Sequence, residues 1–285
     1  MSDQGGNPLA ARIQSCATPS KGKNAQNRYK ENDQGMRRER GTDQSCHTVR
    51  PIGFQWYPWV KTALERLVAL LLLIPAGPVI LLAACLVKLT SKGPAFYTQT
   101  RVGKGGKPFT IYKLRTMINK CESLTGPRWS VPGDPRVTRV GQFLRLTHLD
   151  ELPQLLNVLK GDMALIGPRP ERPEFVPELE LAFPCYRQRL NVRPGVTGLA
   201  QVQLPADTDL GSVEAKLAYD LYYIQSLSPW MDLKILAGTI LYTLGASYGV
   251  VRWLIRLPQQ ELIQQRARPF LEQGRAQSRS TREAA

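Results

Sequence analysis

Residues 139–176, with the sequence RVGQFLRLTHLDELPQLLNVLKGDMALIGPRPERPEFV, are the stretch around which the rest of the chain is organised. Two acidic residues, Asp150 and Glu151, stand side by side at its centre. Four arginines flank the pair: Arg139, Arg145, Arg169 and Arg172. This acidic pair is the first candidate for a functional site.

The pair lies at the start of a predicted helix. Leucines follow it at the spacing of one helix face: Leu152, Leu155, Leu156 and Leu159. Thr147 or Asp150 would be the N-cap, since both side-chain types accept bonds from free backbone N–H groups. Pro153 is tolerated in a first turn. The electropositive start of such a helix would favour phosphate.

The arginines indicate which chemistry the pair supports. Nearby positive charge lowers a carboxyl pKa, which makes a poor general acid but a suitable nucleophile toward phosphorus. A second carboxylate can hold Mg²⁺, which prefers oxygen ligands and substrate phosphates. The simpler interpretation, that Asp150 and Glu151 only cap a helix, is disfavoured by the arginines and by the rigid turn Pro168-Arg169-Pro170, which aims a guanidinium.

Charge and composition narrow the classes of partner. The 285 residues include 38 Lys and Arg against 23 Asp and Glu, a formal net charge of +15. This excess indicates a nucleic acid, a phosphorylated substrate or an anionic membrane surface. The cysteines form no CxxC pair, so the sequence does not indicate a cysteine metal site. The chain has 2 histidines, which excludes a multi-histidine metal site.

The amino-terminal third predicts a membrane attachment. Residues 1–53 are polar and basic and predict a disordered arm. Residues 54–92 predict a membrane-associated helix, because an aromatic and basic collar precedes an uncharged run at 67–87 that is long enough to span a bilayer. Pro75 and Pro78 bend that helix, which either spans with a kink or returns to the same face. Basic residues on both flanks favour the re-entrant form with both ends in the cytoplasm.

The remainder predicts a mainly helical domain with a small β-hairpin. Residues 96–101 and 109–114 are the expected strands. Lys113 and Arg115, near the end of the second strand, are weaker candidates for phosphate binding. Further helices are predicted at three places: residues 178–190, residues 216–227, and an interfacial amphipathic helix within residues 229–257, for which a second membrane span is the competing interpretation. The chain after Arg266 is polar and is expected to be loose.

Five blocks, in chain order, resemble the bacterial sugar transferase family, the monotopic phosphoglycosyl transferases. They are the proline-broken helix, KLTSKGPAFYTQTRVGKGGKPFTIYKLRTM (88–117), the block at 134–175 that contains the acidic pair, RPGVTGLAQV (193–202) and YDLYYIQSLSPWMDLKI (219–235). Three places depart from the family pattern. Glu65 stands where an Asp is usual, Gly77-Pro78, with an extra Pro75, stands where the helix is usually broken at Ser-Pro, and Gln203-Leu204-Pro205 replaces a polar segment.

The resemblance implies transfer of a sugar 1-phosphate from a UDP-sugar to polyprenyl phosphate. It implies Asp150 as the phosphorylated nucleophile and Glu151 as the ligand of a Mg²⁺ cofactor. Substrate phosphates would be bound by basic residues: Arg145, Arg169, Lys113, Arg115 and Arg139. The implied setting is the cytoplasmic face of a bacterial inner membrane, with membrane lipid but no nucleic acid as a partner and with a homodimer left open.

The expected architecture is therefore α+β. It combines the disordered arm (1–53), the kinked or re-entrant helix (54–92), a cytosolic catalytic domain with a carboxy-terminal interfacial helix (93–250) and a polar tail (251–285). The alternative is a membrane-anchored module that binds nucleotides or nucleic acid without catalysis. Neither the sugar nor the glycan pathway follows from the sequence.

Overall fold

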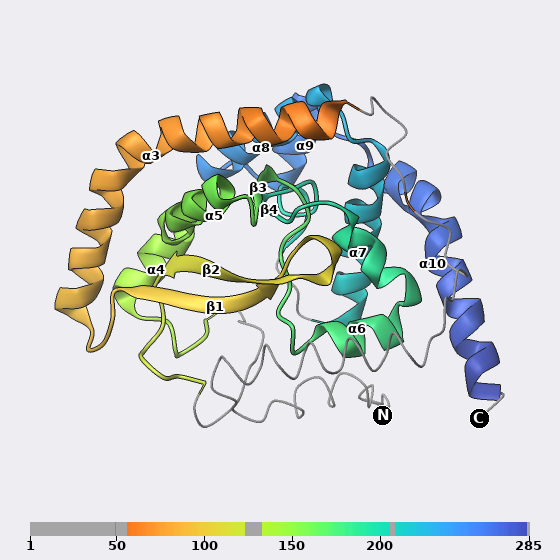
Figure 1. Cartoon of the computed structure of the whole chain (residues 1–285), viewed down its shortest axis with the longest axis horizontal. Coiled ribbons are helices and arrows are strands. Elements are labelled where there is room, and N and C mark those ends of the chain that lie inside the picture. The colour runs from red at the N-terminus through yellow and green to blue at the C-terminus, as the bar shows by residue number, and fades with distance from the viewer. Residues whose placement is uncertain (1–48, 50–55, 123–132, 206–208, 284–285) are drawn as a thin grey trace.

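The computed structural model describes residues 49, 56–122, 133–205 and 209–283. Long helices surround two small sheets (Figure 1). The elements are α3 (Tyr57–Thr90), β1 (Phe96–Val102), η1 (Lys104–Gly106), β2 (Pro108–Leu114), α4 (Arg139–Leu146), η2 (Leu149–Gln154), α5 (Leu155–Lys160), β3 (Ala164–Ile166), α6 (Val176–Ala182), η3 (Pro184–Asn191), β4 (Gly195–Thr197), α7 (Leu210–Gln225), α8 (Pro229–Thr243), α9 (Tyr248–Ile255) and α10 (Gln260–Glu283). Apart from Val49, which is buried, the predicted basic arm lies outside the described residues.

Both sheets are two-stranded, and the first is the predicted hairpin. β1 pairs with β2 in antiparallel register, from Phe96 opposite Leu114 to Val102 opposite Pro108. Gly105 in the connecting turn has φ +66°, a left-handed conformation that glycine adopts without strain. The second sheet pairs β3 with β4 in parallel and places the turn after Ile166 beside the chain at Thr197.

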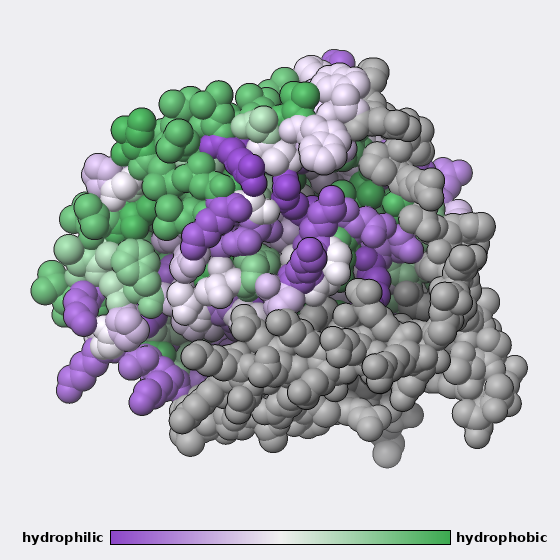
Figure 2. Space-filling model, viewed as in Figure 1, coloured by the Kyte–Doolittle hydropathy of each residue, from purple (hydrophilic) through white to green (hydrophobic). Residues whose placement is uncertain are grey.

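Helix α3 matches the predicted membrane-associated segment. It runs without interruption for 34 residues, with Pro75 and Pro78 inside it, and it bends near its middle (Figure 1). It is the one helix, among the described residues, that is long and apolar enough to cross a membrane. Leucine-rich faces of α3 are exposed, including Leu70 at 54 % and Leu81 at 66 %, and Figure 2 shows this hydrophobic surface as a continuous band. Whether the helix is re-entrant stays a prediction.

Two predicted helices have different bounds in the structure. The helix expected at 178–190 is divided into α6 and the 3-10 helix η3, because Pro184 cannot donate a backbone hydrogen bond. The helix expected at 216–227 begins earlier, at Leu210, where Asp209 and Ser212 form a capping box.

The carboxy-terminal third also differs from the sequence-based expectation. Residues 229–257 form two helices, α8 and α9, separated at Gly245, which has φ +93°. The expectation of a loose chain after Arg266 is wrong, because α10 continues through it. Ile263 and Ala267 of α10 are fully buried against the core around α7.

Two apolar clusters hold the site elements in place. The larger one surrounds α7 and includes Leu221, Leu179 of α6 and Ile235 of α8, all with no exposed surface. The smaller one joins α3, β2 and α5: Ala69, Ala76, Phe109, Ile111, Leu155, Val158 and Met163. Small alanines let α3 approach the hairpin and α5 closely, so one side of α3 packs on the domain while its leucines face outward.

A buried polar cluster joins the first turns of α3 to α8. Asp232 of α8 accepts hydrogen bonds from the Tyr57 hydroxyl (2.5 Å), from Lys61 Nζ (2.6 Å) and from the Tyr223 hydroxyl (2.8 Å). Lys61 Nζ also donates to Glu65 Oε1 at 2.7 Å. One ammonium group therefore lies between two buried carboxylates.

The same cluster reaches the end of β3. Glu65 Oε1 accepts the backbone N–H of Ile166 at 3.0 Å, and the Tyr223 hydroxyl lies 3.2 Å from the Ile166 carbonyl oxygen. Glu65 is one of the departures from the family pattern, and its carboxylate here contacts the strand that leads into Pro168-Arg169-Pro170. Helix α3 is thus bonded directly to the backbone before that turn.

Replacing Lys61 by Met tests the importance of this cluster. We expect a loss of about 3–5 kcal/mol in the free energy of unfolding, because the substitution leaves two buried carboxylates without their cation. The triple variant Lys61→Met, Glu65→Gln, Asp232→Asn should lose less than the single one. Denaturation in detergent micelles measures both. Arg268→Ala, which removes an exposed ion pair with Glu272, is the control. Equal losses of unfolding free energy in Lys61→Met, the triple variant and this control would contradict the importance of the buried cluster.

Candidate active site

The acidic pair lies in a 3-10 helix, not at the cap of an α-helix. Thr147 follows α4, and its hydroxyl donates to the carbonyl oxygens of Phe143 and Leu144. His148 then adopts a left-handed conformation, φ 55°, and begins η2 without a side-chain capping bond. The predictions of Thr147 or Asp150 as the N-cap are therefore wrong, and positive side chains, rather than a helix start, supply the positive charge.

The close packing of α4 fixes where this segment begins. Thr138 caps α4 by accepting the Gly141 N–H at 2.9 Å. A Cβ at Gly141 would fall on the Thr116 backbone carbonyl, so a glycine is required there. α4 consequently lies directly against the end of β2, which carries Lys113.

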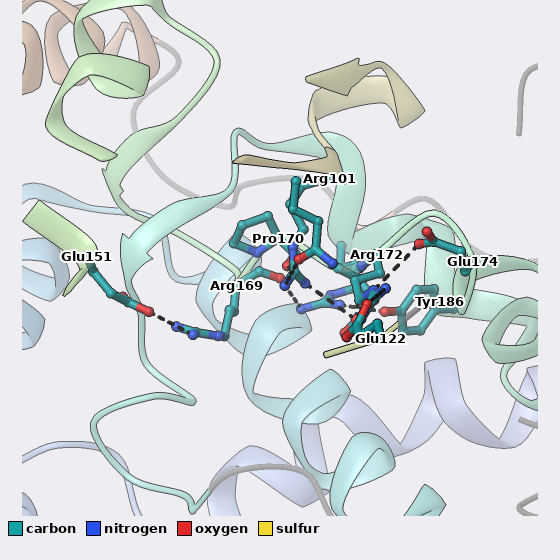
Figure 3. Close-up of polar contacts among 11 residues, drawn as sticks. Arg101, Glu122, Glu151, Arg169, Pro170, Arg172, Glu174 and Tyr186 are labelled. Carbon is teal, nitrogen blue, oxygen red and sulfur yellow. Dashed lines mark hydrogen bonds and ion pairs between the residues drawn. The ribbon is translucent and has the colours of Figure 1, made fainter. Parts of the chain in front are cut away.

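Glu151 receives two cationic side chains on one oxygen. Lys113 Nζ donates to Glu151 Oε1 at 2.7 Å, and Arg169 Nη2 donates to the same atom at 2.9 Å; Figure 3 shows the Arg169 side chain reaching toward Glu151. Burial raises the pKa of Glu151, but the charges and hydrogen bonds of Arg169 and Lys113 outweigh burial and hold that pKa well below its usual range. Glu151 is therefore a carboxylate at any physiological pH.

Asp150 has the opposite electrostatic environment. Its side chain is buried, and burial, followed by the charge of Glu151, raises its pKa above the usual aspartic value. Lys113, Arg145 and Arg169 lower that pKa, but by less. The expectation that the basic neighbours give Asp150 a lowered pKa is therefore wrong: they act mainly on Glu151.

The other predicted phosphate ligands lie in different places. Arg145 lines the same cavity as the acids, and its Nε donates to the Thr116 hydroxyl at 2.9 Å. Arg115 also lines the cavity, yet its guanidinium donates to the carbonyl oxygens of Ser91 and Lys92, just after α3. Arg139 is exposed at the start of α4 and, among the described residues, is not part of the cavity wall. A substrate contact for Arg115 or Arg139 stays a prediction.

The turn that carries Arg169 is held by residues that the sequence did not single out. Arg189 Nη2 donates to the Arg169 carbonyl oxygen at 2.9 Å, and Arg189 itself is held by Asp220 of α7 at 2.7 Å. Arg101 Nη1 donates to the Pro170 carbonyl oxygen at 3.1 Å. Gly167 has no room for a Cβ, because the Arg193 carbonyl occupies that position. Contacts between residues so far apart in the chain leave no local sequence signal.

A cavity of about 860 Å³ connects these groups. Its wall includes Asp150, Glu151, Lys113, Arg145 and Arg169. On the far side of Arg169 from Glu151, Arg172 pairs with both carboxylate oxygens of Glu122, at 2.9 and 3.0 Å (Figure 3). The cavity therefore combines buried acids with several fixed cations, which suits an anionic substrate with more than one phosphate.

The residues present fit a single hard cation that is shared with a phosphate. Among the described residues there is no cluster of three or more acidic, histidine or cysteine side chains that would enclose a metal ion. Mg²⁺ commonly binds through one or two carboxylates together with substrate phosphates. Both cationic partners of Glu151 contact Oε1, which leaves Oε2 and the neighbouring Asp150 to hold such an ion.

The fold and site combine a long apolar helix with a cavity that holds two acids and several cations, and comparison with known proteins specifies the family. Residues 56–246 match the bacterial sugar transferase family. The chain belongs to that family, which confirms the resemblance seen in the sequence.

Three relatives illustrate the breadth of the match. The chain is 44 % identical over 184 residues to the UDP-N-acetylgalactosamine-undecaprenyl-phosphate N-acetylgalactosaminephosphotransferase of Aeromonas hydrophila (65 % of this chain, 43 % of the relative). It is 47 % identical over 184 residues to the UDP-glucose:undecaprenyl-phosphate glucose-1-phosphate transferase of Caulobacter vibrioides (63 % and 68 %). It is 40 % identical over 202 residues to the exopolysaccharide production protein PSS of Rhizobium leguminosarum (67 % and 98 %). The match therefore spans less than half of the Aeromonas protein.

The opposite pKa shifts of the two acids have opposite consequences for stability. Glu151, with a lowered pKa, contributes stability that is present above its unfolded pKa of about 4.3 and is lost as the pH falls. We expect Glu151→Gln to destabilise the protein at pH 7 by about 2 kcal/mol, typical of lost hydrogen bonds to a charged group. Asp150→Asn should stabilise it at pH 7, since it removes a buried charge next to another carboxylate.

Unfolding at pH 7 and pH 4 in detergent micelles measures both variants. The difference between wild type and Glu151→Gln should shrink at the lower pH, because pH 4 lies below the unfolded pKa of about 4.3 and the unfolded chain takes up a proton that folded Glu151 does not. Destabilisation by Asp150→Asn as large as that by Glu151→Gln would contradict the assignment of the two environments.

Proposed function

We propose that this protein is a phosphoglycosyl transferase that moves a sugar 1-phosphate from a UDP-sugar to polyprenyl phosphate, the first step in assembling an exopolysaccharide, O-antigen or other glycoconjugate. The observation that carries the proposal is the buried Asp150 beside Glu151, whose Oε1 is bound by Lys113 and Arg169 inside one cavity. The names of the relatives, which pair a UDP-sugar with undecaprenyl phosphate, support the two substrates.

Asp150 is the nucleophile of a two-step reaction. A carboxylate oxygen of Asp150 attacks the phosphorus that bears the sugar, and the bond from that phosphorus to the UMP oxygen breaks, so that UMP leaves with the electron pair. An oxygen of polyprenyl phosphate then attacks the same phosphorus, and the bond to Asp150 breaks. The carboxylate is restored and polyprenyl diphosphate sugar is released.

The residues around Asp150 have separate roles in this reaction. Arg145 and Arg169 offset the diphosphate charge, which would otherwise repel the attacking carboxylate. Lys113 and Arg169 keep Glu151 ionised, so that it can serve as the Mg²⁺ ligand. A Mg²⁺ ion held by Glu151 would supply positive charge that offsets the charge developing during transfer. Burial raises the pKa of Asp150, and positive charge near the bound donor would favour the ionised form that attacks.

The membrane arrangement follows the distribution of apolar surface. α3 has its leucines exposed along both halves, while α8 and α9 expose Ile240, Leu244, Trp253 and Leu254. Such helices lie with one face in the lipid interface. In this proposal α3 enters the inner membrane, bends at Pro75 and Pro78 and returns to the cytoplasmic face, where the catalytic domain resides.

The covalent step is tested by intact-protein mass spectrometry after exposure to UDP-glucose or UDP-N-acetylgalactosamine with Mg²⁺ and no acceptor. We expect a sugar-phosphate adduct on the peptide that contains Asp150, accompanied by UMP release. Asp150→Asn should form no adduct while its folding and membrane binding persist. An adduct on another peptide, or near-normal turnover by Asp150→Asn, would refute the mechanism; nucleotide that binds unchanged would favour a binding module.

The re-entrant topology is tested by single cysteines at the two ends of α3. Trp59 and Leu89 are suitable positions because their side chains are 82 % and 83 % exposed. With a membrane-impermeant thiol reagent we expect neither position to label in intact cells and both to label after lysis. Labelling of one position from outside the cell shows a spanning helix instead. The background control is the parent chain in which the five native cysteines have been replaced.

A further inference from the structure

The cavity continues past the acidic pair to an aromatic wall. Its members are His148 of the catalytic segment, Tyr242 of α8 and Tyr248 of α9, all of which line the cavity. The rings of Tyr242 and Tyr248 are stacked with centroids 5.1 Å apart, and the His148 ring lies 5.5 Å from that of Tyr242. We refer to these three residues as the aromatic wall.

His148 has a backbone conformation that is energetically unfavourable for most residues other than glycine. His148 is one of three described non-glycine residues with positive φ, and it stands two residues before Asp150. Histidine tolerates this conformation better than most residues, yet it remains uncommon outside glycine. The left-handed turn both starts η2 and directs the imidazole toward α8. The aromatic wall is thereby attached to the segment that carries the nucleophile.

The wall belongs both to the cavity and to helices that carry exposed apolar surface. The helices that supply its tyrosines expose large apolar side chains, among them Ile240 at 55 %, Leu244 at 79 % and Val250 at 49 %. On the far side of Arg169 the cavity is bordered instead by Arg101, Arg172 and Glu122. A nucleoside diphosphate suits that charged side, whereas a hydrocarbon chain would leave those charges without solvent.

We propose that the aromatic wall is the subsite for the isoprene units next to the phosphate of the polyprenyl acceptor. The chain would pass from the lipid interface over Tyr248 and Tyr242 to His148, which places its phosphate beside Asp150. Apolar isoprene units pack favourably on aromatic rings that have lost water. This assignment rests on the proposed function and adds to it the separation of the acceptor side of the cavity from the donor side.

The two half-reactions separate the acceptor side from the donor side. Adduct formation needs donor alone, whereas discharge of a preformed adduct needs acceptor. His148→Asn removes the ring but keeps a residue that tolerates the left-handed conformation. For His148→Asn and Tyr242→Ala we expect discharge to undecaprenyl phosphate to slow at least about tenfold, as is usual when one hydrophobic contact in a binding pocket is lost. Adduct formation should slow far less than discharge, so that the ratio of the two rates changes, and Tyr242→Phe, which keeps the ring, should restore most of the discharge rate that Tyr242→Ala loses.

Tyr97→Leu is the matched control, because Tyr97 lines the same cavity on β1. It should slow adduct formation more than discharge. If His148→Asn and Tyr242→Ala instead slow adduct formation, the wall contacts the donor and the proposal is overturned. Unchanged rates in both half-reactions overturn it as well.

A second measurement does not depend on any donor. Undecaprenyl phosphate that carries a diazirine on a phosphate-proximal isoprene is photolysed with wild-type protein in mixed micelles, and the crosslinked peptides are mapped. Crosslinks to peptides with Tyr242 or Tyr248 support the subsite even if no adduct forms, so failure of the covalent mechanism remains distinguishable. Crosslinks confined to β1 and residues 116–122 refute it.

Discussion

The position of the long apolar helix α3 relative to the turn that carries Arg169 depends on one buried ion cluster. Lys61 of α3 lies between Glu65 and Asp232, and Glu65 bonds the backbone of Ile166. Three residues further along, Arg169 reaches Glu151. A buried cation between two carboxylates tolerates little displacement, since each partner would be left uncompensated in a low-dielectric interior. The apolar anchor and the cationic turn are therefore parts of one rigid arrangement.

Charged neighbours also give the two acids of the site different pKa values. They are adjacent in the chain, yet Lys113 and Arg169 both contact Glu151, while Asp150 is buried next to a neighbour of like charge. The result is one carboxylate that stays ionised and one whose pKa is raised. In the proposed reaction this difference suits Asp150 as the nucleophile and Glu151 as the metal ligand.

The architecture places this charged centre close to apolar surface. α3, α8 and α9 expose hydrophobic side chains, and the cavity that contains the acids also reaches the tyrosines of α8 and α9. Donor and acceptor in the proposed reaction differ sharply in polarity, and a cavity with a charged side and an aromatic side can hold both. The departure at Gln203 belongs to this region, because Gln203 accepts a hydrogen bond from Arg252 of α9 at 2.9 Å.

The sequence alone determined the family, the acidic pair, the hairpin and the bent apolar helix, because each depends on residues that are close together in the chain. Local periodicity and proline placement carry that information. Only the tertiary structure decided that Lys113 shares Glu151 with Arg169, that Arg115 binds the chain after α3, and that Arg189 supports the catalytic turn. It also showed that the pKa of Asp150 is raised rather than lowered, and that α10 packs on the core. Burial and contacts between distant residues decide these points, and neither can be obtained from spacing along the chain.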